Sequence, residues 1–179
     1  MAYVLRKIRM NRWYKTDKVP WLPECDLQAD VLDDLRTKCN ELSVYFIDDN
    51  ESNLDRVIAA LAANTNTASN IDFAVFGQEI LSEIDIKIKK SRGELSDDLV
   101  NACHNDLCEL SAPKLLELAI IIKAKARIDR KGPKQILNLV ADSIIKGRID
   151  RKRINWEKSD MDKVDEVIST HKSRTTETR

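Results

Sequence analysis

Alternation of apolar and polar residues is the pattern that most restricts the fold of this chain. Ile84, Ile86 and Ile88 alternate with charged residues. Successive side chains of a strand point to opposite faces, so this segment is predicted to be a strand with one apolar face. Its lysines on the open face suit the edge of a sheet. Similar patterns predict further strands within residues 1–10, 42–47 and 71–77.

Two helices are expected between these strands. Asp26 can cap an apolar stripe in the residues that follow it, and Ser52 or Asn53 can cap a second one. Residues 1–95 are therefore predicted to form a small α/β subdomain with a sheet of three or four strands.

The second half of the chain has helical spacing. From Ser96 onward the apolar pattern predicts helices at about 96–110, 112–129, 133–146 and 158–171. The glycine and proline at 132 and 133 end one of these helices and begin the next. We therefore expect an α+β protein in which a helical subdomain, residues 96–171, follows the α/β unit. Residues 172–179 are expected to be a disordered tail.

Composition limits the cellular setting. The apolar run from Leu115 to Ile122 is interrupted by Glu117 and is far shorter than the roughly 20 residues that a bilayer requires. No apolar segment follows the basic N-terminus, so no signal peptide is expected. We expect a cytoplasmic protein with reduced cysteines and no membrane partner.

Charge is distributed unevenly along a chain whose net charge is zero. Residues 1–20 carry a net +5, residues 21–110 a net −12 and residues 111–179 a net +7. This distribution suits a protein that meets one partner through cations and another through carboxylates. Self-complementary packing is the alternative.

A five-residue sequence occurs twice. Arg127–Lys131 recurs as Arg148–Lys152, and the segment from Lys123 to Arg153 holds eleven basic and three acidic residues. Such a segment suits a polyanion such as nucleic acid, or a protein partner. The alternative is that these cations only stabilise helix C-termini. The candidate binding residues are Lys123, Arg127, Arg130, Lys131, Lys134, Lys146, Arg148, Arg151, Lys152 and Arg153.

The same segment carries a resemblance to a known module. Helices 112–129 and 133–146 have the lengths of a helix-turn-helix, and residues 144–150 predict a helix end, a glycine and a short strand. This stretch is similar to the end of a winged-helix module, as in PCI-type subunits of regulatory complexes. The resemblance implies DNA binding or protein docking. Asp142 on the outer face of the second helix argues against reading of bases by that helix.

Three large apolar residues are candidate partner contacts. Trp13 and Trp21 belong to a proline-containing segment that either seals the core or presents a binding surface. The 112–129 helix is apolar nearly all round, which favours burial of the whole helix. Ile121 falls on its thin polar stripe, and it is exposed to a partner if the helix is not buried.

Candidate metal or catalytic residues form no specific motif. Cys103, His104 and Cys108 lie in one predicted helix, where the last two face the same way and could bind zinc. No Cys-x-x-Cys sequence supports this site, and no glycine-rich nucleotide loop can be assembled. We expect no cofactor and no resident metal.

A group of aspartates offers a second chemistry. Asp48 and Asp49 follow a predicted strand, and Asp72 could join them as a Mg²⁺ site. The same residues also suit a turn and a helix cap.

The leading hypothesis is a non-catalytic accessory or adaptor subunit that docks on a larger, bacterial assembly and contributes the basic surface. One alternative is a metal-dependent nuclease or phosphodiesterase that uses Asp48, Asp49 and Asp72. Another is an immunity or antitoxin-like protein of a conflict or antiviral defence operon, whose acidic middle covers a basic toxin.

Overall fold

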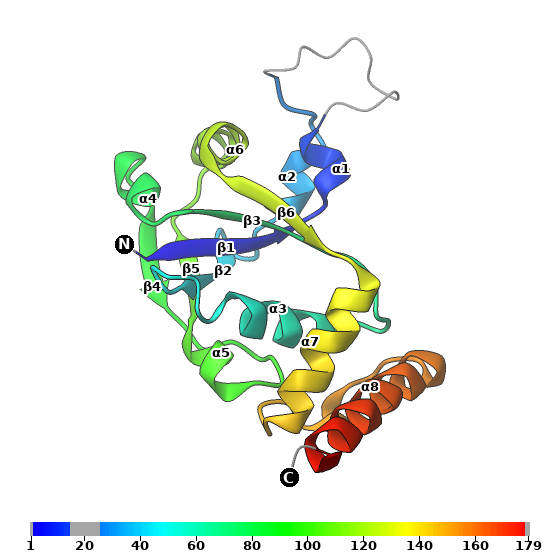
Figure 1. Cartoon of the computed structure of the whole chain (residues 1–179). Coiled ribbons are helices and arrows are strands. Elements are labelled where there is room, and N and C mark those ends of the chain that lie inside the picture. Colours follow the sequence, from blue (N-terminus) through cyan, green and yellow to red (C-terminus); the bar gives the residue numbers. More distant parts are fainter. Residues whose placement is uncertain (1, 15–25, 178–179) are drawn as a thin grey trace. The chain divides into compact units, whose positions relative to one another are not determined.

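The structure, a computed structural model, describes residues 2–14 and 26–177 and divides into two compact units (Figure 1). The sheet unit comprises Met1–Ser52, Asp72–Arg92 and Cys103–Arg130. The helical unit comprises Asn53–Ile71, Gly93–Ala102 and Lys131–Arg179. Each unit draws on both halves of the chain, whereas the sequence pattern predicted a single boundary near residue 95.

A six-stranded antiparallel sheet forms the centre of the sheet unit, in the order β4-β5-β2-β1-β3-β6. The strands are β1 (Tyr3–Ile8), β2 (Leu42–Ile47), β3 (Ile71–Gly77), β4 (Lys87–Lys90), β5 (His104–Cys108) and β6 (Arg127–Lys131). In the register, Tyr3 lies opposite both Ile47 and Gly77, and Ile8 lies opposite Asp72. The strands predicted within 1–10 and at 42–47 and 71–77 are therefore confirmed.

One face of this sheet is covered by helices (Figure 1). They are α1 (Met10–Trp13), α2 (Val31–Asp34), α4 (Glu79–Glu83) and α6 (Ala112–Lys125). Alternate strand residues such as Val4 and Ile8 pack against Trp13, Leu81 and Ile122 in one apolar cluster. Trp13 is only 2% exposed, so this candidate partner residue is part of the core, as expected for a large ring.

Asp34 fastens α2 to the turn after β1. Its buried carboxylate accepts hydrogen bonds from the Arg9 backbone N–H at 2.8 Å, from Trp13 Nε1 at 2.9 Å and from Arg12 at 2.9 Å. Arg6 donates to the Asp34 backbone carbonyl. Because these three donors satisfy the Asp34 carboxylate, its charge is stable in a buried position.

The helical unit contains α3 (Leu54–Ala63), α5 (Asp98–Ala102), α7 (Pro133–Ile145), the short 3₁₀ helix η1 (Arg151–Arg153) and α8 (Lys158–Glu177). Helix α7 packs against both α3 and α8. Trp156 Nε1 donates to the Ala62 carbonyl at 3.0 Å, which joins the segment before α8 to α3. Asp97, 1% exposed, accepts both of its ion-pair hydrogen bonds from Arg56.

The predicted sheet of three or four strands is too small, because two strands lie where only helices were expected. Residues 96–110 form α5 and then β5, which is inserted between β4 and β2. The 112–129 helix stops at Lys125, and β6 follows. In both segments, pairing with neighbouring strands selects the extended conformation and overrides a weak local preference for helix.

Two further boundaries differ from expectation. Strand β4 begins at Lys87 and not at Ile84. Ile84 is the C-cap of helix α4, and both Ile84 and Ile86 are buried before the strand begins. The place of β4 at the sheet edge is as predicted. After Gly147, the described residues form η1 and not a strand. The wing of the winged-helix-like element is therefore not found.

Candidate functional site

Helix α6 presents an apolar stripe on the side opposite the core. Leu118, Ala119 and Ile122 are buried, whereas Leu116 and Ile120 are 48% and 53% exposed. Pro113, Leu116, Ile120 and Ala124 are all exposed and share one face, because they recur at spacings of three and four residues. We call these four residues the α6 stripe. The expectation that this helix is wholly buried is wrong.

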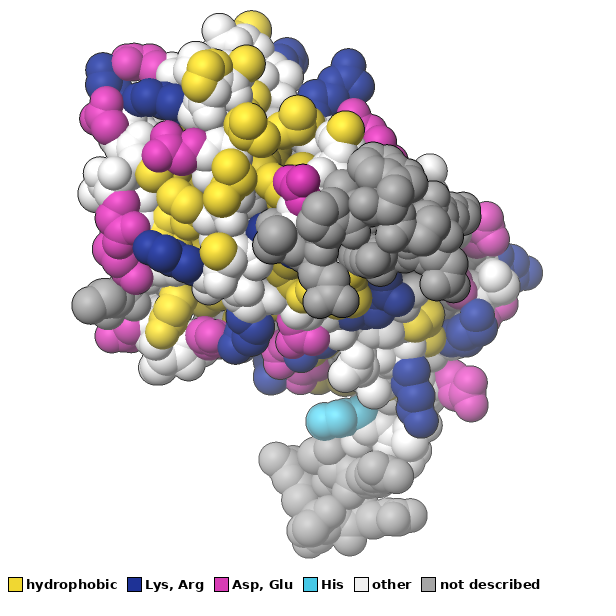
Figure 2. Space-filling view, turned by 90° about the horizontal axis from the view of Figure 1, so that it is seen from above, with side chains coloured by type: hydrophobic (Ala, Val, Ile, Leu, Met, Phe, Trp, Pro, Cys, Tyr) yellow, Lys and Arg dark blue, Asp and Glu magenta, His cyan; other side chains and the backbone are white. Residues whose placement is uncertain are grey.

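Tyr14 and Leu32 are further exposed side chains with apolar surface beside the α6 stripe. The Lys123 ammonium lies 4.8 Å from the centre of the Tyr14 ring, and it also donates to the Trp13 carbonyl. Leu32, 43% exposed, belongs to α2, which packs on α6. Figure 2 looks onto this side and shows apolar side chains gathered there. A surface of this kind is typical of a protein-binding site.

Charges border the α6 stripe asymmetrically. Lys114 pairs with Asp85 at 3.2 Å and Lys125 pairs with Glu83 at 2.8 Å, so these cations are already compensated. Lys123 and Glu117 have no ion-pair partner among the described side chains. At 100° per residue they fall on opposite sides of the stripe. With respect to the described side chains, the stripe is thus bordered by one cation and one carboxylate without an ion-pair partner.

The predicted partner residue Ile121 lies elsewhere on α6. It is half-buried and packs against the apolar core of the sheet unit. Leu116 and Ile120 take the exposed positions instead. Trp21, the remaining aromatic candidate, lies outside the described residues.

Half of the ten predicted basic-site residues form ion pairs with described side chains. In the sheet unit, Arg127 pairs with Glu51 at 2.7 Å and Arg130 makes two bonds to Asp72, at 2.6 and 3.0 Å. In the helical unit the pairs are Lys131 with Asp55, Lys146 with Asp142 and Arg151 with Asp165. The basic segment thus neutralises part of the acidic middle of its own chain.

Besides Lys123, four candidate cations have no ion pair with a described side chain. Lys134 lines a groove of about 770 Å³ between α7 and α8, beside Leu137 and Ile145. The other three are Arg148, Lys152 and Arg153. They lie within six consecutive residues at the second copy of the repeat, and the last two are exposed.

The three aspartates of the predicted Mg²⁺ site are not brought together. Asp48 and Asp49 line a shallow pocket of about 460 Å³ beyond the Tyr3 end of β1. Asp72 lies opposite Ile8, at the other end of that strand, roughly 17 Å away at 3.3 Å per residue. Among the described residues no group of three or more His, Cys, Asp or Glu side chains could hold a metal ion.

Strand β5 also separates the proposed zinc ligands. His104 and Cys108 point to the same face but lie four strand residues apart, or roughly 13 Å. Burial, together with the neighbouring Glu41 carboxylate, raises the pKa of the Cys108 thiol. Cys108 is therefore a weak nucleophile at neutral pH.

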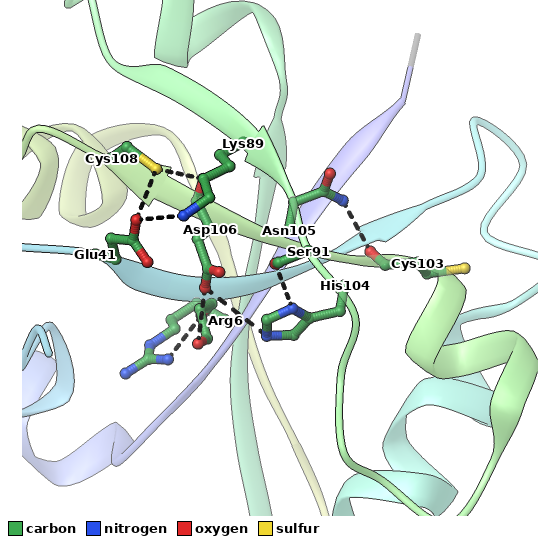
Figure 3. A network of polar contacts seen from close by, with 10 residues as sticks. Arg6, Glu41, Lys89, Ser91, Cys103, His104, Asn105, Asp106 and Cys108 are labelled. Carbon is green, nitrogen blue, oxygen red and sulfur yellow. Dashed lines mark hydrogen bonds and ion pairs between the residues drawn. The ribbon is translucent and has the colours of Figure 1, made fainter. Parts of the chain in front are cut away.

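His104 belongs instead to a polar row across the sheet (Figure 3). The register continues from Lys90 opposite Asn105, so Ser91, His104 and Tyr45 are neighbours on the face opposite the apolar core. Ser91 Oγ lies 2.8 Å from His104 Nδ1, and Asp106 Oδ1 lies 4.0 Å from His104 Nε2. The Tyr45 ring meets the imidazole edge to face at 5.2 Å.

Burial controls the ionisation of this row. It lowers the pKa of His104, which the nearby Lys90 also lowers and the Asp106 carboxylate raises. Burial raises the pKa of Tyr45 to about 12, so its hydroxyl stays protonated. The imidazole is therefore neutral at pH 7 and can accept a proton.

The sequence pattern did not indicate that Ser91, Asp106 and Tyr45 are neighbours of His104. In a helix, the two-residue spacing of His104 and Asp106 points their side chains apart, whereas in a strand it places them on one face. The alternation of His104, Asp106 and Cys108 with the buried Leu107 was the available signal.

Comparisons with known proteins give no relative. No protein-family model, curated protein or solved structure matches this chain.

Within the described residues, no helix combines the length and the apolar character needed to cross a bilayer.

Proposed function

We propose that this protein is an accessory subunit that docks on a larger protein through the α6 stripe. The observation that supports this proposal is that Leu116 and Ile120 are about half exposed. They lie on the outer side of α6, whose inner side already packs in the core. When a partner removes aliphatic side chains from water, their burial stabilises the complex by about 25 cal/mol per Å² of buried apolar surface.

The occupant that fits this surface is an amphipathic helix of the partner. The stripe extends over eleven residue steps of α6, or roughly 16 Å. Its spacing of three and four residues matches the apolar rows through which two helices pack. Lys123 on one side and Glu117 on the other require a partner helix with an acidic flank and a basic flank. This charge arrangement sets the orientation of the bound helix.

The test compares a double charge substitution in the α6 stripe with a single charge substitution at an exposed apolar residue elsewhere. Full-length protein carrying Leu116→Glu and Ile120→Glu should lose its partner, because carboxylates would enter the apolar contact. Leu99→Glu is the matched control, since Leu99 is 61% exposed but belongs to the helical unit. Carbodiimide treatment of the wild-type complex should join Lys123 to a partner carboxylate, located by peptide mass spectrometry.

Two results contradict this proposal. One is a complex that survives the double substitution with Lys123 unlinked. The other is a wild-type homodimer in sedimentation equilibrium that the double substitution dissociates, because the stripe would then bind a second copy of this chain.

A second candidate function is contact with a nucleic-acid backbone by Arg148, Lys152 and Arg153. The observation that favours it is that they form no ion pair with a described side chain, whereas Arg127 and Arg130 of the first copy are neutralised by Glu51 and Asp72. Uncompensated cations release counterions from phosphates on binding. Salt-dependent binding to an oligonucleotide is the property that tests it.

A further inference from the structure

Ser91, His104 and Asp106 are arranged in the order of a nucleophile, a base and an orienting carboxylate (Figure 3). The Ser91 hydroxyl oxygen lies at hydrogen-bond distance, 2.8 Å, from His104 Nδ1. Asp106 faces the other ring nitrogen at 4.0 Å and is itself held by the Ser43 hydroxyl at 3.1 Å. The docking function uses none of these residues.

The carboxylate determines which imidazole nitrogen carries the proton. A negative charge 4.0 Å from Nε2 favours the tautomer with its N–H at Nε2. Nδ1 is then the lone-pair nitrogen, and Ser91 donates its hydroxyl hydrogen to it. The T-shaped contact with Tyr45 limits rotation of the ring. His104, 8% exposed, is thus held as a base against one hydroxyl.

We propose that Ser91 is a site of covalent acylation, activated by His104 and taking its acyl group from a small ester or thioester with a good leaving group. Ser91 Oγ attacks the acyl carbon while its proton passes to His104 Nδ1. The bond from that carbon to the leaving oxygen or sulfur breaks, and the leaving group takes its electron pair. The imidazolium then returns the proton to the leaving group, so the products are acyl-Ser91 and a neutral alcohol or thiol.

The position of Ser91 in the fold gives the acyl donor access to the Ser91 hydroxyl. Ser91 directly follows β4, which is an edge strand, and it is only half-buried. The neighbouring groups from each strand are Lys90 of β4, Asp106 of β5 and Tyr45 of β2. The hydroxyl itself lies at hydrogen-bond distance, 2.8 Å, from His104 Nδ1.

The experiment measures acetylation of the full-length protein by 4-nitrophenyl acetate, with each serine quantified by peptide mass spectrometry. Ser91 should react at least about 100-fold faster than Ser52, the typical lower range of general-base catalysis. Ser52 is a matched internal control, because its hydroxyl bonds to the Asp48 carboxylate at 2.6 Å and to no imidazole. This comparison uses the unmodified chain and does not depend on any variant folding.

Variants and pH separate activation from exposure. His104→Gln should bring Ser91 down to the Ser52 rate, and Asp106→Asn should cause a smaller loss. The Ser91 rate should rise with pH to a plateau whose midpoint lies below the ordinary histidine pKa, since burial lowers the pKa of His104. Equal rates at Ser91 and Ser52, or a Ser91 rate unchanged in a folded His104→Gln protein, would overturn the proposal.

Discussion

The two copies of Arg-Ile-Asp-Arg-Lys have the same sequence and different structures. The first, Arg127–Lys131, is strand β6 at an edge of the sheet. The second, Arg148–Lys152, leaves α7 through a turn and enters η1. The backbone N–H groups of Arg148 and Ile149 both donate to the Ser143 carbonyl and so close the helix end. Gly147 permits this turn with its φ of 66°.

Context explains the difference. The first copy follows an alanine in extended conformation and pairs next to β3, where Asp72 accepts Arg130. In the second copy, the Asp150 side chain accepts the Lys152 N–H at 2.9 Å and begins a 3₁₀ turn. A five-residue sequence therefore does not determine its own conformation or the availability of its charges. The residues that surround it do.

Charge reversal should give the largest difference between the copies. Arg148→Glu, Lys152→Glu and Arg153→Glu together should abolish binding to a fluorescent single-stranded 20-mer in an anisotropy titration. For wild type, three phosphate contacts predict a slope of about −2 for log affinity against log salt concentration. Arg36→Glu, at an exposed cation of the sheet unit, is the control and should bind normally. Wild-type binding that does not depend on salt would exclude the backbone contact.

Shortening the isoleucine of each copy should give a smaller difference. Ile149 is 2% exposed, so Ile149→Ala should reduce the free energy of unfolding by about 2 to 4 kcal/mol. Ile128 is only partly buried against the core, and Ile128→Ala should cost about 1 kcal/mol. Urea unfolding followed by circular dichroism measures both. Equal losses would mean that the two copies are buried to the same extent.

The acid dependence of stability should give the smallest effect. Burial raises the pKa of Asp72, but hydrogen bonds from Arg130 and from the Met10 N–H outweigh it, so the pKa lies below its usual value. A depressed pKa stabilises the fold above the unfolded value, about 4, and this stabilisation is lost as pH falls through the folded value.

The measurement compares urea midpoints of wild type and Asp72→Asn from pH 7 down to pH 2. Wild type should be more stable at pH 7, and the difference should disappear at the acid end. Asp165→Asn is the control at the second copy, where the pair with Arg151 is exposed on both sides and contributes little. A gap between wild type and Asp72→Asn that is constant with pH would contradict the role given to the Asp72 carboxylate.

Strong local patterns predicted much of the fold. Alternation located β1, β2 and β3, and apolar spacing located α3, α7 and most of α6, with Gly132 and Pro133 at the corner. Strands β5 and β6 were missed. Asn105 and Asp106 give β5 little strand propensity, and β6 is mostly charged, so only their neighbours in the sheet select the extended conformation.

By itself, the sequence determined the α+β class, the basic segment and the nearly all-round apolar character of α6. Tertiary structure decided which of these features reach solvent. It placed one side of α6 on the core and left the α6 stripe outside, and it paired Arg127 and Arg130 with carboxylates distant in the chain. It also aligned Ser91 with His104 through strand register. The physical reason is that periodicity is set by nearby residues, whereas exposure, ion pairing and register depend on segments that meet only when the chain folds.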